Sequence, residues 1–270
     1  MLADAKSDMA FINELDVTDI QNGDAAPMGL KGHNAPPTIM LWGDSHAMAA
    51  APAIDAILLG NGYSGCAATH SSTAPVLDWF TASKFGLNEK SLAFNEAVVS
   101  YIKTHNIPLV VLHAHWRTYL TSPDAQDGAF EDSLLTTVEF LIEIGAKPYI
   151  LLDVPRHTFD VPRKLSRSVI SGGDVSMLCT RRLSDEDYDG FSPNLIRMIE
   201  EAGGIIVDPK PIFLDPEGEY YRVHSNDIVF YRDSSHLTVA GSKFLLKPFL
   251  ADILADDLIR LGGNSLRGRE

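Results

Sequence analysis

Short apolar runs alternate with amphipathic stretches along most of this chain. Five runs have the length and composition of buried strands, at residues 38–42, 63–68, 109–112, 148–152 and 205–207. Apolar residues on one helical face predict helices at residues 46–59, 88–105, 130–144, 185–202 and 238–261. Two further apolar segments, 220–223 and 228–231, predict a hairpin.

This alternation predicts the fold class and the domain organisation. Strands separated by helices form a mostly parallel sheet, and right-handed crossovers place helices on both of its faces. We therefore expect an α/β fold, a three-layer α/β/α sandwich of flavodoxin-like type, over residues 38–262. Residues 155–183, rich in Arg, Ser and Gly, predict an insertion. Residues 1–37 are expected to be a leader or linker with room for one short helix, and residues 263–270 a tail.

Composition and charge narrow the classes of function. The 270 residues are 45% hydrophobic, which excludes a wholly disordered chain. The net charge of −14 repels phosphate backbones, so we expect no nucleic-acid partner. No apolar run reaches the roughly 20 residues that span a bilayer, and the first residues lack the pattern of a signal peptide. We expect a cytosolic protein or a soluble piece of a longer one.

The cysteines and two histidines raise the question of metal or disulfide chemistry. Cys66 and Cys179 could pair in an oxidising compartment or remain ordinary thiols, and neither has the spacing that zinc requires. His113 and His115 alternate at the end of a predicted strand, but two histidines without a third ligand make weak evidence for a metal. We therefore expect no metal and no cofactor.

Two segments at the ends of predicted elements carry candidate chemistry. Gly43-Asp44-Ser45 follows the first buried strand, where a helix N-terminus offers N–H groups to a developing oxyanion. Alone, Ser45 could merely cap the helix, since serine is a favoured N-cap. Before the last helix, Asp233 and His236 are three residues apart, a spacing that lets a carboxylate orient the imidazole toward a serine.

These two segments resemble the first and last motifs of the SGNH/GDSL hydrolase superfamily, Gly-Asp-Ser and Asp-x-x-His. The resemblance implies that Ser45 is the nucleophile and His236 the general base and acid. It also implies that Asp233 holds His236 in position. The implied mechanism is acyl transfer through an acyl-serine.

The resemblance is closer to one branch, the soluble SGNH domain fused to acyltransferase-3 membrane proteins. It rests on segments 41–47, 95–116, 154–163 and 230–241, and spans roughly residues 38–250. Those proteins are O-acyltransferases of cell-surface polysaccharide, lipopolysaccharide or peptidoglycan. The resemblance implies an acyl donor, a glycan acceptor and a fused or partner membrane acyltransferase domain. It also implies a periplasmic or extracytoplasmic location. A carbohydrate esterase or a non-catalytic glycan- or partner-binding module would share these residues.

The chain departs from the superfamily pattern at the oxyanion hole. The superfamily's second and third motifs supply a glycine N–H and an asparagine amide, and no Gly-x-Asn-Asp is present here. The Ser45 backbone is the expected first donor. The second is left open among the backbone of residues 69–72 and the side chains of His115 and Arg117, with His115 standing where the fused domains tend to have arginine.

Several other side chains have two open interpretations. Asp44 is expected to hold the turn before Ser45. The insertion contains three arginines, Arg156, Arg163 and Arg167. They could contact an anionic glycan or a partner domain, or they could simply be solvated. Aromatic pairs that could stack on sugar rings, or simply pack in the core, are Trp79-Phe80 and Tyr220-Tyr221.

Overall fold

A central sheet organises the domain. The computed structural model describes residues 12–30, 36–175, 178–181, 190–225 and 227–267. Within these residues the sheet has six strands in the order β1-β3-β2-β4-β5-β7. The neighbours from β3 to β7 are parallel, and β1 pairs antiparallel with β3 at one edge. The strands are β1 (Ala26–Gly29), β2 (Ile39–Gly43), β3 (Ser64–Thr69), β4 (Leu109–His113), β5 (Lys147–Leu151) and β7 (Ile205–Val207).

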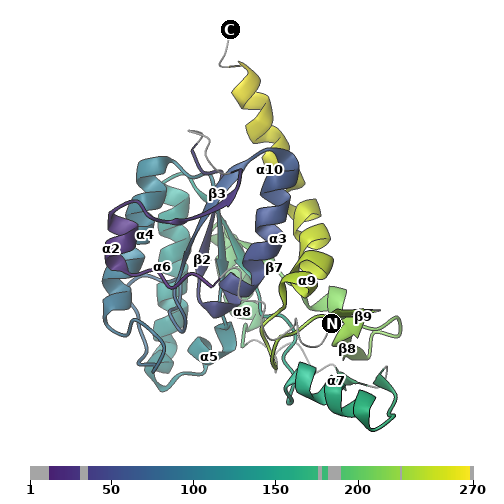
Figure 1. Cartoon of the computed structure of the whole chain (residues 1–270). Coiled ribbons are helices and arrows are strands. Elements are labelled where there is room, and N and C mark those ends of the chain that lie inside the picture. The colour runs from purple at the N-terminus through teal and green to yellow at the C-terminus, as the bar shows by residue number, and fades with distance from the viewer. Residues whose placement is uncertain (1–11, 31–35, 176–177, 182–189, 226, 268–270) are drawn as a thin grey trace.

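Helices cover both faces of this sheet (Figure 1). One layer contains α3 (Ser45–Asn61), α9 (Val239–Gly241) and α10 (Lys247–Arg267), the last two joined by a π-helical turn at Ser242–Leu246. The other contains α2 (Val17–Gln21), α4 (Lys90–His105), α6 (Ala129–Glu143) and α8 (Pro193–Glu201).

Strand β2 shows why the sheet is buried on both faces. Ile39 and Leu41 pack into the core beneath α3, whereas Met40 and Trp42 pack into the core beneath α4 and α6. Successive side chains of a strand point to opposite faces, so an uninterrupted apolar run serves two helical layers. The predicted three-layer α/β/α sandwich with a mostly parallel sheet is confirmed.

The predicted helices differ from the observed ones mainly at their ends. The last helix continues to Arg267, into the segment expected to be a tail. Helix α8 begins at Pro193 rather than at residue 185, because Ser192 caps it by accepting a hydrogen bond from the Leu195 N–H. Residues 185–189 of that predicted helix lie outside the described residues.

Part of the segment expected to be a leader or linker belongs to the sheet and its helical layers. Asp16 and Asp19 form a capping box at the start of the short helix α2. Strand β1 then lies along β3, with Pro27 opposite Cys66. A proline is tolerated there because β1 is an edge strand. The four residues Ala-Pro-Met-Gly have no strand-like alternation, so sequence patterning does not predict them.

The insertion contributes a helix and one strand of a small sheet. Helix α7 (Val161–Ile170) is followed by β6 (Cys179–Arg181), which pairs antiparallel with β8 (Tyr220–Arg222). The predicted hairpin is therefore wrong for residues 220–222, because the insertion supplies their partner. Its inner part is present, with β9 (His224–Ser225) paired to β10 (Ile228–Val229). The remaining short helices are α5 (Trp116–Leu120), η1 (Pro123–Gly128) and η4 (Lys210–Phe213).

The two cysteines, both within the described residues, form no disulfide with each other. Cys66 is buried on β3, where burial raises the pKa of its thiol to about 12. Cys179 lies on β6 in the insertion. Across the described part of the chain, no helix combines the length and the apolar character needed to cross a membrane.

Candidate active site

Ser45 is placed by a one-residue turn between a strand and a helix. Gly43 ends β2, Asp44 caps the next helix, and Ser45 is the first residue of α3. Strand β2 packs so closely on β4 at this position that a Cβ at Gly43 would lie 1.7 Å from the His113 carbonyl oxygen. The close approach of two backbones therefore requires glycine here.

Asp44 holds this turn against the elements that follow β4. Its carboxylate is buried and accepts hydrogen bonds from the His46 N–H at 2.8 Å and the His115 N–H at 3.1 Å. It also accepts one from the Tyr119 hydroxyl at 2.8 Å. Burial, reinforced by the neighbouring carboxylate, raises the pKa of Tyr119 well above its ordinary value, so that hydroxyl remains a donor. Asp44 thus ties the start of α3 to α5.

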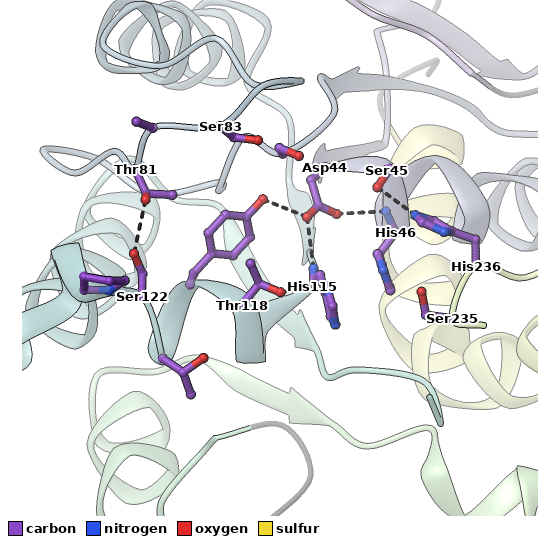
Figure 2. Close-up of a pocket in the computed structure, with 15 residues that line it drawn as sticks. Asp44, Ser45, His46, Thr81, Ser83, His115, Thr118, Ser122, Ser235 and His236 are labelled. Carbon is purple, nitrogen blue, oxygen red and sulfur yellow. Dashed lines mark hydrogen bonds between the residues drawn. The ribbon is translucent and has the colours of Figure 1, made fainter. Parts of the chain in front are cut away.

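Ser45, His236 and Asp233 form a continuous chain of hydrogen bonds, of which Figure 2 shows the contact between Ser45 and His236. Ser45 Oγ lies 2.8 Å from His236 Nε2, and His236 Nδ1 lies 2.8 Å from Asp233 Oδ2. Since ionised Asp233 can only accept, His236 Nδ1–H donates to it, and Nε2 is left to accept the Ser45 proton. The structure brings together the three residues that the two motifs indicated.

Asp233 is fixed by its own loop as well as by the imidazole. Its Oδ1 accepts the backbone N–H groups of Ser235 and His236, each at 2.8 Å. Burial acts to raise the pKa of Asp233, but the hydrogen bonds and charge of His236 and the Ser235 N–H outweigh it and hold that pKa well below its usual range. The carboxylate therefore stays ionised and oriented toward the imidazole.

A cavity of about 500 Å³ opens beside Ser45 and His236. Most of its wall carries hydroxyl groups, and none of the described residues that line it is Lys, Arg or Glu. The lining residues that sequence reasoning did not single out are Thr81, Ala82, Ser83, Thr118, Tyr119, Thr121, Ser122, Pro123 and Ser235. The only local signal for them is the hydroxyl-rich stretch 118–122, which follows the strand that ends at His113.

The candidate donors to an oxyanion differ in whether they line the cavity. The Ser45 N–H begins a helix and has no intrahelical partner. Ser72 lines the cavity in the left-handed region, with φ +50°, and His115 lines it as well. Arg117 is not among the residues that line the cavity, although, alongside burial, its positive charge acts to lower the pKa of the lining residue His115.

Three further histidines surround His236. The His46 ring is buried, stacked on His115 at 4.6 Å and tilted against His236 at 4.5 Å between ring centroids. Burial, aided by the neighbouring histidines, lowers the pKa of His46 well below its ordinary value. His113 donates from Nδ1 to the Leu151 carbonyl at 2.8 Å, so its ring faces the core. Among the described residues, no three or more His, Cys, Asp or Glu side chains are grouped so that they could hold a metal ion.

Burial of His113 predicts a loss of stability in mild acid. Burial lowers the pKa of His113 to about 4, against an ordinary value of 6.5. The unfolded chain then binds a proton between these values that the folded chain does not, so stability is lost as pH falls from 6.5 toward 4. We expect His113 alone to lower the free energy of unfolding by about 2 kcal/mol between pH 7 and pH 5.

Urea unfolding of wild type and His113→Gln at pH 7 and pH 5 measures this contribution. We expect the variant to be less stable than wild type at pH 7, because the hydrogen bond to Leu151 changes, but its unfolding free energy should fall less on acidification. Equal pH dependence in both proteins would show that His113 is not one of the responsible groups.

The aromatic pairs and the insertion arginines, which had two possible roles each, lie partly in the core and partly on the surface. Trp79 and Tyr221 are buried in the core, whereas Phe80 and Tyr220 are partly exposed. Of the three arginines, Arg163 and Arg167 lie on the exposed side of α7, and Arg156 lies in the loop before it. None of these residues lines the cavity beside Ser45.

The fold and the position of these residues define a protein class. An α/β/α sandwich, with Gly-Asp-Ser after the first parallel strand and Asp-x-x-His before the last helix, is a domain of SGNH/GDSL hydrolase type. The chain belongs to the family described as "SGNH domain (fused to AT3 domains)", whose model matches residues 13–251. The predicted family is confirmed, and the match begins within the segment expected to be a leader.

One of the solved structures that are similar to this chain supports the fold. The periplasmic domain of a lipopolysaccharide acetyltransferase from Salmonella ser. Paratyphi A is similar with a TM-score of 0.63 at 14% identity, covering 93% of this chain and 92% of that one. A GDSL-like lipase from Bacteroides thetaiotaomicron has a TM-score of 0.43 at 9% identity, covering 84% of this chain and 92% of that one. A search of the curated proteins finds no match.

Proposed function

We propose that this domain is an acyl-transfer enzyme that forms an acyl-serine at Ser45, with His236 and Asp233 completing a catalytic triad. The observation that carries the proposal is the hydrogen-bond chain from Ser45 Oγ through His236 to Asp233, which opens on the hydroxyl-lined cavity. The family supports acyl chemistry in general.

In the first half-reaction, His236 Nε2 takes the Ser45 proton while Ser45 Oγ attacks the acyl carbonyl carbon. The resulting imidazolium faces Asp233, which stabilises its charge. His236 then returns the proton to the leaving oxygen as the bond to the donor breaks, and the acyl group remains on Ser45. In the second half-reaction an acceptor hydroxyl loses its proton to His236, attacks the acyl-serine and releases Ser45 with that proton.

The oxyanion of each tetrahedral intermediate needs at least two donors, and we assign them to the backbone N–H groups of Ser45 and Ser72. Both residues line the cavity. The N–H of Ser72 makes no hydrogen bond to any described residue. The left-handed backbone at Ser72, φ +50°, supports this role because it turns the chain sharply beside the cavity. His115 is a third candidate, through the ring nitrogen that does not bond to Thr118.

The cavity favours a sugar as the acyl acceptor and a short acyl group as the cargo. Hydroxyl side chains can exchange hydrogen bonds with sugar hydroxyls, and the described residues that line the cavity carry mostly hydroxyl groups rather than the apolar side chains that a fatty acyl chain would need. We propose O-acetylation of a cell-surface polysaccharide or lipopolysaccharide, with the acyl group delivered by a fused or partner AT3 domain. This assignment places the domain in the periplasm or another extracytoplasmic compartment.

An esterase is the second candidate, because both reactions use the same triad and differ only in the acceptor. His236 keeps part of its side chain exposed, so water can reach the acyl-serine. A non-catalytic binding module is the third candidate function. It is disfavoured by the 2.8 Å contact between Ser45 and His236, which simple glycan binding does not require.

Trapping the intermediate tests this proposal. We expect the chain, mixed with p-nitrophenyl acetate and quenched rapidly, to gain one acetyl group that peptide mass spectrometry locates on Ser45. Adding an acceptor oligosaccharide should speed loss of the label and yield acetylated sugar. Loss to water alone would assign an esterase, and a chain that never acquires label would contradict acyl transfer.

The source of the acyl group can be tested with the same chain. Among the described residues that line the cavity, none is a lysine or arginine that could bind a phosphorylated donor, and the net charge of the chain is −14. We therefore expect no Ser45-dependent acetylation of the sugar from acetyl-CoA alone. Efficient transfer from acetyl-CoA would show that no AT3 partner is needed.

A further inference from the structure

Helix α7 presents a combination of charge and apolar surface that the proposed reaction does not use. Arg163, Lys164 and Arg167 are exposed, in a chain whose net charge is −14. None of the three has an ion pair or side-chain hydrogen bond with any described residue. At the end of the same helix, Val169 is 59% exposed and Ile170 is 86% exposed.

The helical spacing places these groups together. Arg163, Arg167 and Ile170 are four and three residues apart, so they share one face of α7. Val169 continues the buried stripe of Val161 and Leu165, yet it is largely exposed, so the stripe extends past the part of the domain that covers it. Figure 1 shows α7 at the periphery, below β8 and apart from the helices that cover the sheet.

We propose that α7 docks on an anionic lipid surface, with the aliphatic end among the headgroups and the three cations against lipid phosphates. Basic residues beside exposed aliphatic side chains match both properties of such a surface. A soluble anionic glycan would leave Val169 and Ile170 without a role. A stable protein interface buries about 800 Å² on each partner, more than two side chains provide.

This docking would also position the candidate active site. The Val161 N–H, at the start of α7, donates to the Asp233 carbonyl at 3.1 Å, and the His157 N–H donates to the Ser234 carbonyl at 2.8 Å. The helix has ten residues, so Ile170 lies ~15 Å along the helix axis from the loop that carries Asp233. A docked α7 therefore holds that loop close to the lipid surface. The inference goes beyond acyl transfer and does not depend on it.

Vesicle flotation tests the proposal with the whole chain. The probes are vesicles of phosphatidylcholine alone and of phosphatidylcholine with an equal amount of phosphatidylglycerol, at low and high salt. We expect binding to the anionic vesicles only, weakened by salt. Binding should fall on the order of 10-fold or more in Arg163→Gln/Arg167→Gln, and by a similar factor in Val169→Ser/Ile170→Ser.

Two matched variants control for charge and for exposed apolar surface elsewhere. Lys90→Gln/Lys103→Gln removes two exposed cations from α4, and Ile259→Ser removes a side chain that is 71% exposed on α10. Both should bind as wild type, and thermal unfolding checks that all variants fold. The proposal is overturned if anionic vesicles bind no better than neutral ones, or if the α7 variants behave like the controls. It is equally overturned if an anionic polysaccharide displaces the chain while Val169 and Ile170 have no effect.

Discussion

Replacing Ser45 or His236 by alanine should reduce turnover of p-nitrophenyl acetate by similar factors, of order 10³ or more. The two side chains share one proton across a 2.8 Å contact, so loss of either disables the same attack. In Asp233→Ala the loss of turnover should be roughly 10-fold smaller. His236 Nε2 can still accept the Ser45 proton, although the carboxylate that orients the ring is gone. Initial rates under saturating ester measure all three effects.

Ser235→Ala is the matched control for Ser45→Ala. Ser235 lines the same cavity and is adjacent to His236, but it supports Asp233 through its backbone N–H, which alanine retains. We expect its activity to stay near that of wild type. Undiminished turnover in Ser45→Ala would exclude an acyl-serine at Ser45. A large loss of turnover in Ser235→Ala would instead indicate Ser235 as the nucleophile.

Gly43→Ala should destabilise the fold by at least about 3 kcal/mol or prevent folding. The added methyl group would lie 1.7 Å from the His113 carbonyl oxygen and 2.9 Å from the Ala47 Cβ. The obstructing atoms are backbone of β4 and a buried residue of α3, so neither can move away as a flexible side chain would. Separating β2 from β4 would also displace the turn that carries Ser45.

Gly60→Ala provides the comparison within the same segment of chain. Gly60 lies near the end of α3, and nothing lies within 4 Å of a Cβ built there. Alanine should leave the unfolding free energy unchanged or raise it by roughly 0.5–1 kcal/mol. Urea unfolding of the two variants measures the difference, and a Gly43→Ala protein as stable as wild type would show that the strands can separate without cost.

The elements that sequence patterning predicted are those whose pattern arises locally. The buried strands of the parallel sheet face apolar layers on both sides, so the sequence of each strand is a continuous apolar run, as at residues 109–112. The helices that cover them repeat every three or four residues, as at residues 130–144. Asp233 and His236 are also local, since one turn of chain sets their distance. These features required no knowledge of the rest of the fold.

Other features depend on segments that meet only in the folded chain. Strand β1 is four residues with a proline, and it becomes a strand because the edge of β3 accepts it. Residues 220–222 pair with β6 rather than within a hairpin, because a distant insertion reaches them. Ser72 lines the cavity and Arg117 does not, since this depends on how loops cross the sheet edge.

For the candidate active site, local patterns in the sequence predict which residue types stand at the ends of which elements. Tertiary structure alone decided that Ser45 and His236, 191 positions apart, meet at 2.8 Å. Glycine is required at position 43 because the backbone of the neighbouring strand β4 lies so close, which is also a tertiary contact. The physical reason is that helix and strand patterns record contacts between near neighbours and burial, whereas a cavity wall is made where distant segments pack against one another.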